Sequence, residues 1–267
     1  MLGKPISMVW RVVLGLAGVC LVLAGYTHLS NKRLAENEFD RSVPSWSMMK
    51  DGLQKTIEPD RRGDRWLIGD TKASTYRLLA GLGISVFGAL TLGVLMGVLA
   101  PIDSFLYPVM AMASKMVPTA MIAVFFVLLG IGESAFIGIV VFGILPTLTQ
   151  TVALSVRGVH TELIYKAYTL GASHMEIIWN VVLRQIFPAF LDAVRLSIGP
   201  ALVYLIAAEM LFADEGFGYR IRLEMKKLNM DIVFPYIAIM AMLFFVLDFV
   251  LNRFNRWANP WNTPAEH

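Results

Sequence analysis

The side chains that most often carry catalysis are scattered in this sequence. The four histidines, His28, His160, His174 and His267, are far apart and lack metal-ligand spacing. The segment Gly83–Phe87 begins like the G-x-S-x-G turn of hydrolases but ends in Phe. No H-E-x-x-H pair and no G-x-x-x-x-G-K-[ST] loop are present. We therefore expect a chain that is not an enzyme, binds no metal or cofactor of its own and does not hold ATP in the usual loop.

Ionisable residues inside long apolar runs indicate another kind of chemistry. An ionised side chain at the centre of a bilayer costs about 2.5–3.5 kcal/mol, so each needs a partner or a function. Asp192 and Arg195 are three residues apart and are predicted to form a structural ion pair on one helix face. Asp248 is predicted either to reach the membrane interface or to meet Arg253.

Lys115 and Glu209 leave more than one interpretation open. Lys115 attracts an anionic solute such as a sulfonate, pairs with Glu209 across the bundle, or lies at the cytoplasmic interface. Glu209 either belongs to an outer gate or pore, or makes a structural hydrogen bond. Together with Arg195, these two residues are the candidate pore or gate residues.

The composition requires a membrane. Of the 267 residues, 57% are hydrophobic and 16% charged, and the mean hydropathy is +0.63. A soluble domain has about 45–50% apolar and about 25% charged residues, so the excess must face lipid. The net charge of +3 comes from scattered bases that form no repeating basic face, which argues against a nucleic-acid partner. The only cysteine, Cys20, cannot form an internal disulfide.

A bilayer core of about 30 Å needs about 20 apolar residues in a helix. By that measure the chain is an all-α polytopic membrane protein, a single transmembrane domain over 1–267 with about six transmembrane helices. The predicted spans are 8–29, 76–100, 105–131, 134–156, 186–212 and 234–254. The first run is either a signal peptide or an anchor. Since further spans follow and no small-residue cleavage site is obvious, it is interpreted as a retained anchor.

The orientation is predicted from the basic residues near the ends. Lys4 and Arg11 mark a cytoplasmic N-terminus, and Arg253 and Arg256 agree at the C-terminus. The polar loop 30–74 is then extracytoplasmic, with short amphipathic helices, and its final part runs along the membrane surface into the second span. The loop 157–185 is cytoplasmic.

Small residues recur every four positions in the second span, which predicts a strip for close helix packing. They are Gly81, Ser85, Ala89, Gly93 and Gly97.

The cytoplasmic loop is patterned as helix, sharp turn and amphipathic helix. Thr161 is predicted to cap a helix beginning at Glu162, and Gly171 to end it in the left-handed conformation. Ser173 and Glu176 fit a capping box for the next helix. This surface can enter a groove on another protein, or it is an ordinary helical linker.

The same stretch resembles the "EAA" loop of the permease subunits of ABC importers. Gly171 falls at the distance that this motif requires from Tyr165, Lys166 and Ala167, although Tyr165 replaces the usual acid and Lys166 an Ala. The resemblance implies a coupling helix that contacts an ATPase through Tyr165, Lys166, Ala167, Thr169, Leu170, Gly171, Ala172 and Ser173.

Two further segments are similar to that family. They are 117–135, with its Pro and Gly-Ile-Gly, and 193–221, which contains Glu209 and ends in Gly216, Gly218 and Tyr219. The branch that it resembles most handles nitrate, sulfonate, taurine and related small solutes.

The resemblance implies a permease of the bacterial inner membrane that forms the pathway for such a solute. Its implied partners are a separate ABC ATPase that binds ATP and Mg, a periplasmic or lipoprotein solute-binding protein, and a second permease copy. An ion-coupled transporter acting without an ATPase is the alternative, although the sequence shows none of the internal repeats common in that class.

Overall fold

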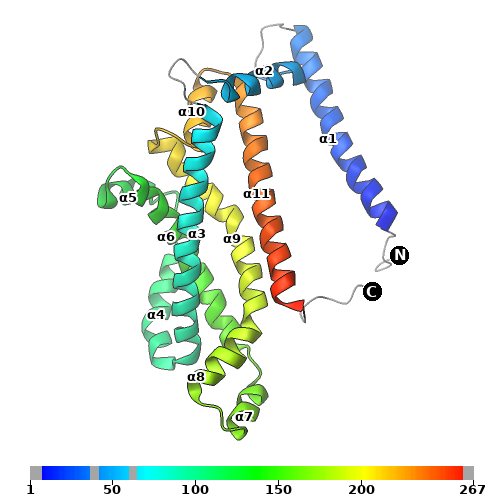
Figure 1. Cartoon of the computed structure of the whole chain (residues 1–267). Helices are drawn as coiled ribbons and strands as arrows, with labels where there is room; N and C mark the ends of the chain where they lie inside the picture. Colours follow the sequence, from blue (N-terminus) through cyan, green and yellow to red (C-terminus); the bar gives the residue numbers. More distant parts are fainter. Residues whose placement is uncertain (1–7, 37–41, 60–64, 261–267) are drawn as a thin grey trace. The chain divides into compact units, whose positions relative to one another are not determined.

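The structure is a computed structural model that describes residues 8–36, 42–59 and 65–260. The described part of the chain is helical and contains no strand, which confirms the predicted all-α class. The helices are α1 (Met8–Glu36), α2 (Trp46–Ile57), α3 (Trp66–Val98), α4 (Ala100–Ala113), α5 (Ile122–Leu129), α6 (Glu133–Arg157), α7 (Thr161–Thr169), α8 (His174–Ile177), the π-helical turn η1 (Ile178–Val182), α9 (Leu183–Phe212), α10 (Phe217–Lys226) and α11 (Met230–Ala258) (Figure 1).

Five stretches among the described residues are long and apolar enough to cross a bilayer. They are Val13–Glu36, Trp66–Val98, Glu133–Arg157, His174–Phe212 and Met230–Ala258. Several are longer than the roughly 20 residues that a span requires. The second begins ten residues before the predicted 76, because the expected surface segment forms the first turns of α3.

The predicted span 105–131 is not one helix. It is divided between α4, which ends at Ala113, and α5, which begins at Ile122. Pro118 lies in the intervening turn, where it has no N–H to donate and disfavours helical geometry at Val117. The sequence indicated the proline but not the length of the interruption.

The chain forms two compact units. The first unit comprises Met1–Leu67 and Ile221–Ala238, and the second unit comprises Ile68–Arg220 and Ile239–His267. In the first unit, the Tyr26 hydroxyl donates to the Pro44 carbonyl at 2.6 Å, and the Tyr26 ring lies 5.3 Å from that of Trp46. These contacts hold α1 to the segment that leads into α2, the short helix predicted within the loop.

The second unit is built around α6, and the small-residue strip of α3 packs on it as predicted. A Cβ added at Gly81 would lie 2.7 Å from the Val140 Cβ, and one at Gly93 would lie 2.6 Å from the Val152 Cβ. Ala89 between them is fully buried. The glycines therefore bring the two backbones together over several turns.

Candidate functional site

The predicted helix, turn and second helix are all present in the loop after α6. α7 starts one residue earlier than expected, with His160 rather than Thr161 at the N-cap, because the His160 carbonyl already accepts the Leu163 N–H at 3.0 Å. Gly171 has φ +83°, the left-handed conformation predicted for it. The Ala172 N–H donates to the Ala167 carbonyl at 3.1 Å and closes the helix end.

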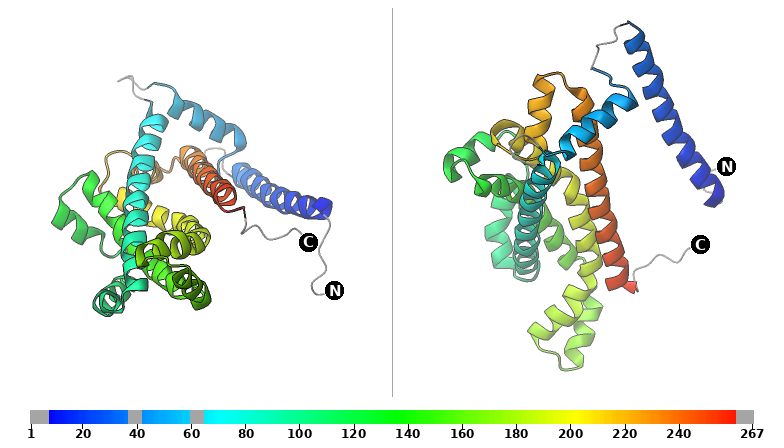
Figure 2. Two further views of the ribbon diagram at one scale, coloured as in Figure 1. Left: turned by 60° about the horizontal axis from the view of Figure 1, so that its bottom comes forward. Right: turned by 45° about the horizontal axis from the view of Figure 1, so that its top comes forward.

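The capping box of the second helix is confirmed in both directions. The Ser173 N–H donates to Glu176 Oε2 at 2.8 Å, and the Glu176 N–H donates to Ser173 Oγ at 3.4 Å. α8, η1 and α9 then continue without interruption from His174 to Phe212, which is 39 residues or about 58 Å at 1.5 Å per residue. Figure 1 and the right-hand view of Figure 2 show α7 and α8 at one end of this helix.

The residues predicted to couple to an ATPase divide into two sets. Ala167 and Ala172 are half-buried and pack on the core of the second unit. The others are exposed, and Tyr165 (67%) and Leu170 (88%) present apolar surface. The exposed set is Tyr165, Lys166, Thr169, Leu170, Gly171 and Ser173. This exposed end of α7 and the turn after it, which we call the tip, is therefore an uncovered apolar surface held by a well-ordered turn.

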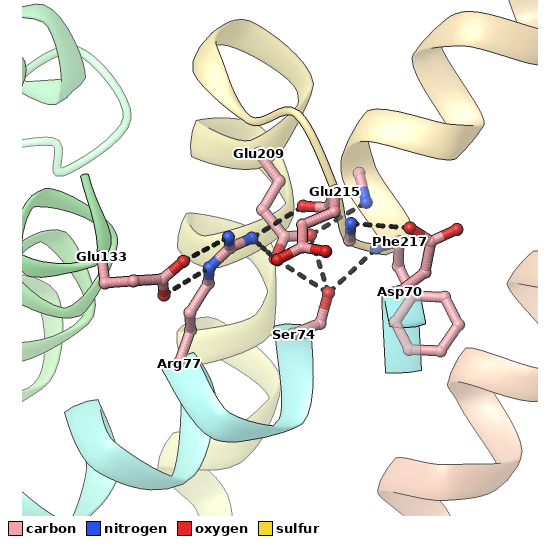
Figure 3. A network of polar contacts seen from close by, with 9 residues as sticks. Asp70, Ser74, Arg77, Glu133, Glu209, Glu215 and Phe217 are labelled. Atoms are coloured by element: carbon pink, nitrogen blue, oxygen red, sulfur yellow. Dashed lines mark hydrogen bonds and ion pairs between the residues drawn. The ribbon is translucent and has the colours of Figure 1, made fainter. Parts of the chain in front are cut away.

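At the other end of α9, Glu209 is completely buried in a network of polar contacts (Figure 3). Its carboxylate accepts the Arg77 Nη1–H at 2.9 Å and the Gly218 N–H at 2.9 Å. The Ser74 hydroxyl lies 2.8 Å from Oε1 and 2.9 Å from Oε2, and itself accepts the Phe217 N–H at 2.9 Å. Three donors thus surround one carboxylate, two of them from α3 and one from the first turn of α10. This is the structural role that was one of the two interpretations of Glu209.

Arg77 joins three elements of the second unit. Besides Glu209 it donates to Glu133 at the start of α6, from Nε at 2.8 Å and from Nη2 at 2.6 Å. Its Nη1 also donates to the Glu215 carbonyl at 2.8 Å, and its Cζ lies 4.4 Å from the centroid of the Phe136 ring. The guanidinium is 3% exposed, whereas Glu133 is 49% exposed. The network is therefore buried at Glu209 and exposed at Glu133.

The α9–α10 loop fits closely around this carboxylate. Gly216 has φ +121°, and a Cβ there would lie 2.7 Å from the Glu209 carboxylate carbon. A Cβ at Gly218 would lie 2.6 Å from the Glu209 Cβ. Asp70 extends the network, accepting the Gly216 N–H at 2.9 Å and the Arg220 Nε–H at 2.9 Å. Both glycines of the Gly-x-Gly-Tyr segment are thus required by the close approach of the loop to Glu209.

Most of this network was not predicted from the sequence. Asp70, Ser74 and Arg77 lie on α3 at intervals of four and three residues, which places them on one helix face, but they were assigned to a surface loop and a span boundary. Glu133 was not singled out. The available signal was an arginine just inside the apolar run of the second span.

Arg195 forms the predicted ion pair with Asp192, but its shorter ion pair is with Asp248. Its Nε lies 3.0 Å from Asp248 Oδ1 on α11, whereas Asp192 is 4.0 Å from its Nη1. Asp192 also accepts the Asn255 amide at 2.9 Å. The predicted alternative in which Asp248 meets Arg253 is wrong, since the antiparallel course of α9 and α11 brings Asp248 to Arg195.

Lys115 lies in the turn between α4 and α5, and its side chain is exposed. The predicted alternative in which it pairs with Glu209 is wrong, because Arg77 holds that carboxylate.

The fold and these features define an all-α, multi-pass membrane protein with an exposed loop helix joined rigidly to a long span. The sequence profile of the binding-protein-dependent transport system inner membrane components matches residues 89–263. The chain belongs to this family and is the permease subunit of an ABC importer.

Its relatives agree. The taurine transport system permease protein TauC of Escherichia coli (strain K12) is 27% identical over 190 residues, which are 71% of this chain and 69% of that one. A putative ABC transporter permease protein, MJ0413, of Methanocaldococcus jannaschii is 32% identical over 184 residues, 68% of each chain. The inward-facing structure of the MetNI methionine ABC transporter covers 80% of this chain and 99% of that one, with a TM-score of 0.60 at 18% identity. That last likeness shows the fold alone.

Proposed function

We propose that this permease carries a small organic anion of the sulfonate or taurine type into the cell, driven by a separate ABC ATPase that docks on α7. A binding protein would deliver the solute to the opposite face, and a second copy of the chain would complete the pathway. The relatives support the solute class, since TauC is a taurine permease and SsuC of Bacillus subtilis, 26% identical over 200 residues, is a putative aliphatic sulfonates permease.

The coupling proposal rests on one observation. The exposed tip is joined to α9 through α8 and η1, which form one uninterrupted helix with it. Tyr165 and Leu170 offer apolar surface to a partner groove, and the turn behind them is fixed by Gly171 and the Ser173–Glu176 capping box. A push on this tip then reaches the bundle along one continuous helix instead of being absorbed in a flexible linker.

The proposed topology places α7 in the cytoplasm, with both termini on that side, and the Glu209 network at the outer face. Cysteine labelling tests it. Cys20→Ser gives a background without thiols, into which Leu170→Cys and Glu215→Cys are introduced separately. A membrane-impermeant maleimide added to intact cells with a permeable outer membrane should label position 215 and not position 170. The reverse pattern would refute the topology.

Uptake by the reconstituted complex tests the function itself. Proteoliposomes containing this chain, its ATPase and its binding protein should accumulate labelled taurine when ATP is supplied. Leu170→Asp should reduce co-purification of the ATPase, because a charge in an apolar contact is desolvated without a partner. Glu58→Ala at the exposed C-cap of α2, outside the proposed contact, is the control and should leave it intact. Equal ATPase recovery with both variants would contradict docking on α7.

A further inference from the structure

The break between α4 and α5 places a lysine where a membrane span is interrupted. Lys115 lies in the turn after Ala113, and its ammonium makes no ion pair and no hydrogen bond to any residue that the structure describes. Two acids on the spans of the second unit are engaged elsewhere. Glu209 is held by Arg77 at 2.9 Å, and Asp248 by Arg195 at 3.0 Å.

Contacts with α6 fix the depth of this turn. At the start of α4, Asp103 forms an ion pair with Arg157 at the C-terminal end of α6. Further along, the Gln150 side-chain amide donates to the Met110 carbonyl at 3.1 Å. α4 therefore runs antiparallel to α6 and advances toward its middle.

The turn itself meets α6 near the centre of that helix. A Cβ added at Gly143 would lie 3.2 Å from Cγ of Pro118, and the Tyr204 ring of α9 borders the same space. Gly143 follows Glu133, the first residue of α6, by ten residues, or about 15 Å along the axis. That is half of a bilayer core of about 30 Å. When Glu133 is taken as one edge of the bilayer core, Lys115, which falls between Met110 and Pro118, is close to its midplane.

A lysine at this depth is costly when it faces lipid. An isolated ammonium there costs at least about 2.5–3.5 kcal/mol. Its four-carbon stem is also far shorter than the roughly 15 Å to either interface, so it cannot place its charge in water by extending along the helix. We therefore expect the exposed side chain to border a polar space inside the assembled transporter.

We propose that Lys115 binds the anionic group of the solute at the midpoint of the translocation pathway. The interrupted helix supplies further donors, since the backbone N–H groups of Val117 and Thr119 have no partner among the described residues. An ammonium with two free amides suits a sulfonate or a similar compact anion. The inference rests on the proposed function and deepens it by assigning a contact for the charged end of the solute.

The test uses the reconstituted complex, with taurine as the probe. Lys115→Met keeps most of the stem and removes the charge, Lys115→Arg retains the charge, and Lys50→Met on the exposed face of α2 is the matched loss of one lysine. A hydrogen bond to a charged group is worth about 1.5–3 kcal/mol, so Lys115→Met should lower taurine uptake roughly ten-fold to a hundred-fold. Lys115→Arg should restore most of it, and Lys50→Met should match the wild type.

Apparent melting temperature and subunit composition distinguish solute contact from a structural role. A Lys115→Met complex that loses uptake while both stay unchanged supports the proposal. Normal uptake by Lys115→Met overturns it and leaves the proposed function intact. Loss of the second permease copy, or a lowered melting temperature, also overturns it by showing that Lys115 pairs with protein. A wild-type complex that hydrolyses ATP but moves no taurine would instead count against the proposed solute class.

Discussion

Removing the charge of Arg77 should destabilise the protein more than any other single change in the polar network. Arg77→Met leaves the Glu209 carboxylate completely buried, with Ser74 and the Gly218 N–H as its remaining donors and no positive charge. The substitution retains an apolar stem of similar length, so the lost charge dominates the effect over lost packing.

The size of the effect follows from burial. Breaking a buried ion pair by removing one partner costs about 3–5 kcal/mol, because the other charge stays desolvated. For a chain of 150–250 residues, 1 kcal/mol corresponds to about 2–4 °C in melting temperature, so Arg77→Met should melt about 6–20 °C lower. Glu133→Gln should cost only about 0–1 kcal/mol, because Glu133 is 49% exposed and Arg77 keeps Glu209.

The assay is thermal unfolding of the purified chain in one detergent, followed by intrinsic fluorescence. Glu215→Gln is the matched control, since its side chain is exposed and only its backbone carbonyl accepts from Arg77. The double variant Arg77→Met with Glu209→Gln should recover part of the loss, because the uncompensated charge is then gone. The reasoning is refuted if Arg77→Met melts no lower than Glu133→Gln, or if the double variant is less stable than Arg77→Met alone.

Three further outcomes follow from the geometry. Gly171→Ala should reduce ATPase co-purification because left-handed backbone costs an L-residue about 1–2 kcal/mol, whereas Gly69→Ala, which also projects into open space, should not. Gly218→Ala should lower the melting temperature, since its Cβ would lie 2.6 Å from the Cβ of the buried glutamate and the backbone must move, at a cost of about 1–3 kcal/mol. The melting temperature of Asp248→Asn should be lower than that of Asp192→Asn. The first substitution removes the charge from the 3.0 Å contact with Arg195, and the second only from the 4.0 Å contact.

The parts of the fold that could be predicted from the sequence are those determined by local patterns. The capping box at Ser173, the left-handed Gly171 and the glycine strip of α3 each follow from residues within a few positions of one another, and all are present. The helix class and most of the spans depend on runs of apolar residues, which a sequence shows directly.

The parts that could not be predicted depend on which helices are neighbours. Arg195 has an acid three residues away, and local spacing favoured that pair, but the antiparallel packing of α11 supplies a closer one. Arg77 and Glu209 are 132 residues apart, so no local pattern connects them. The length of the break around Pro118 also depends on packing against Gly143, which the sequence does not show.

The contacts at the two ends of α9 indicate how motion of the tip is transmitted to the bundle. They favour a rigid-body movement of several helices together. At one end, α7 is fixed to α9 through the capped turn and η1. At the other end, Glu209 is tied to α3 through Arg77 and Ser74, and Arg77 is tied to α6 through Glu133. A tilt of α9 alone would pull a buried carboxylate away from its three donors, whereas a rotation that includes α3 and α6 would break none of these contacts. Displacement of the exposed tip should therefore move these three helices together, and the π-helical turn at Ile178–Val182 is the least regular part of the connection and hence where bending would begin.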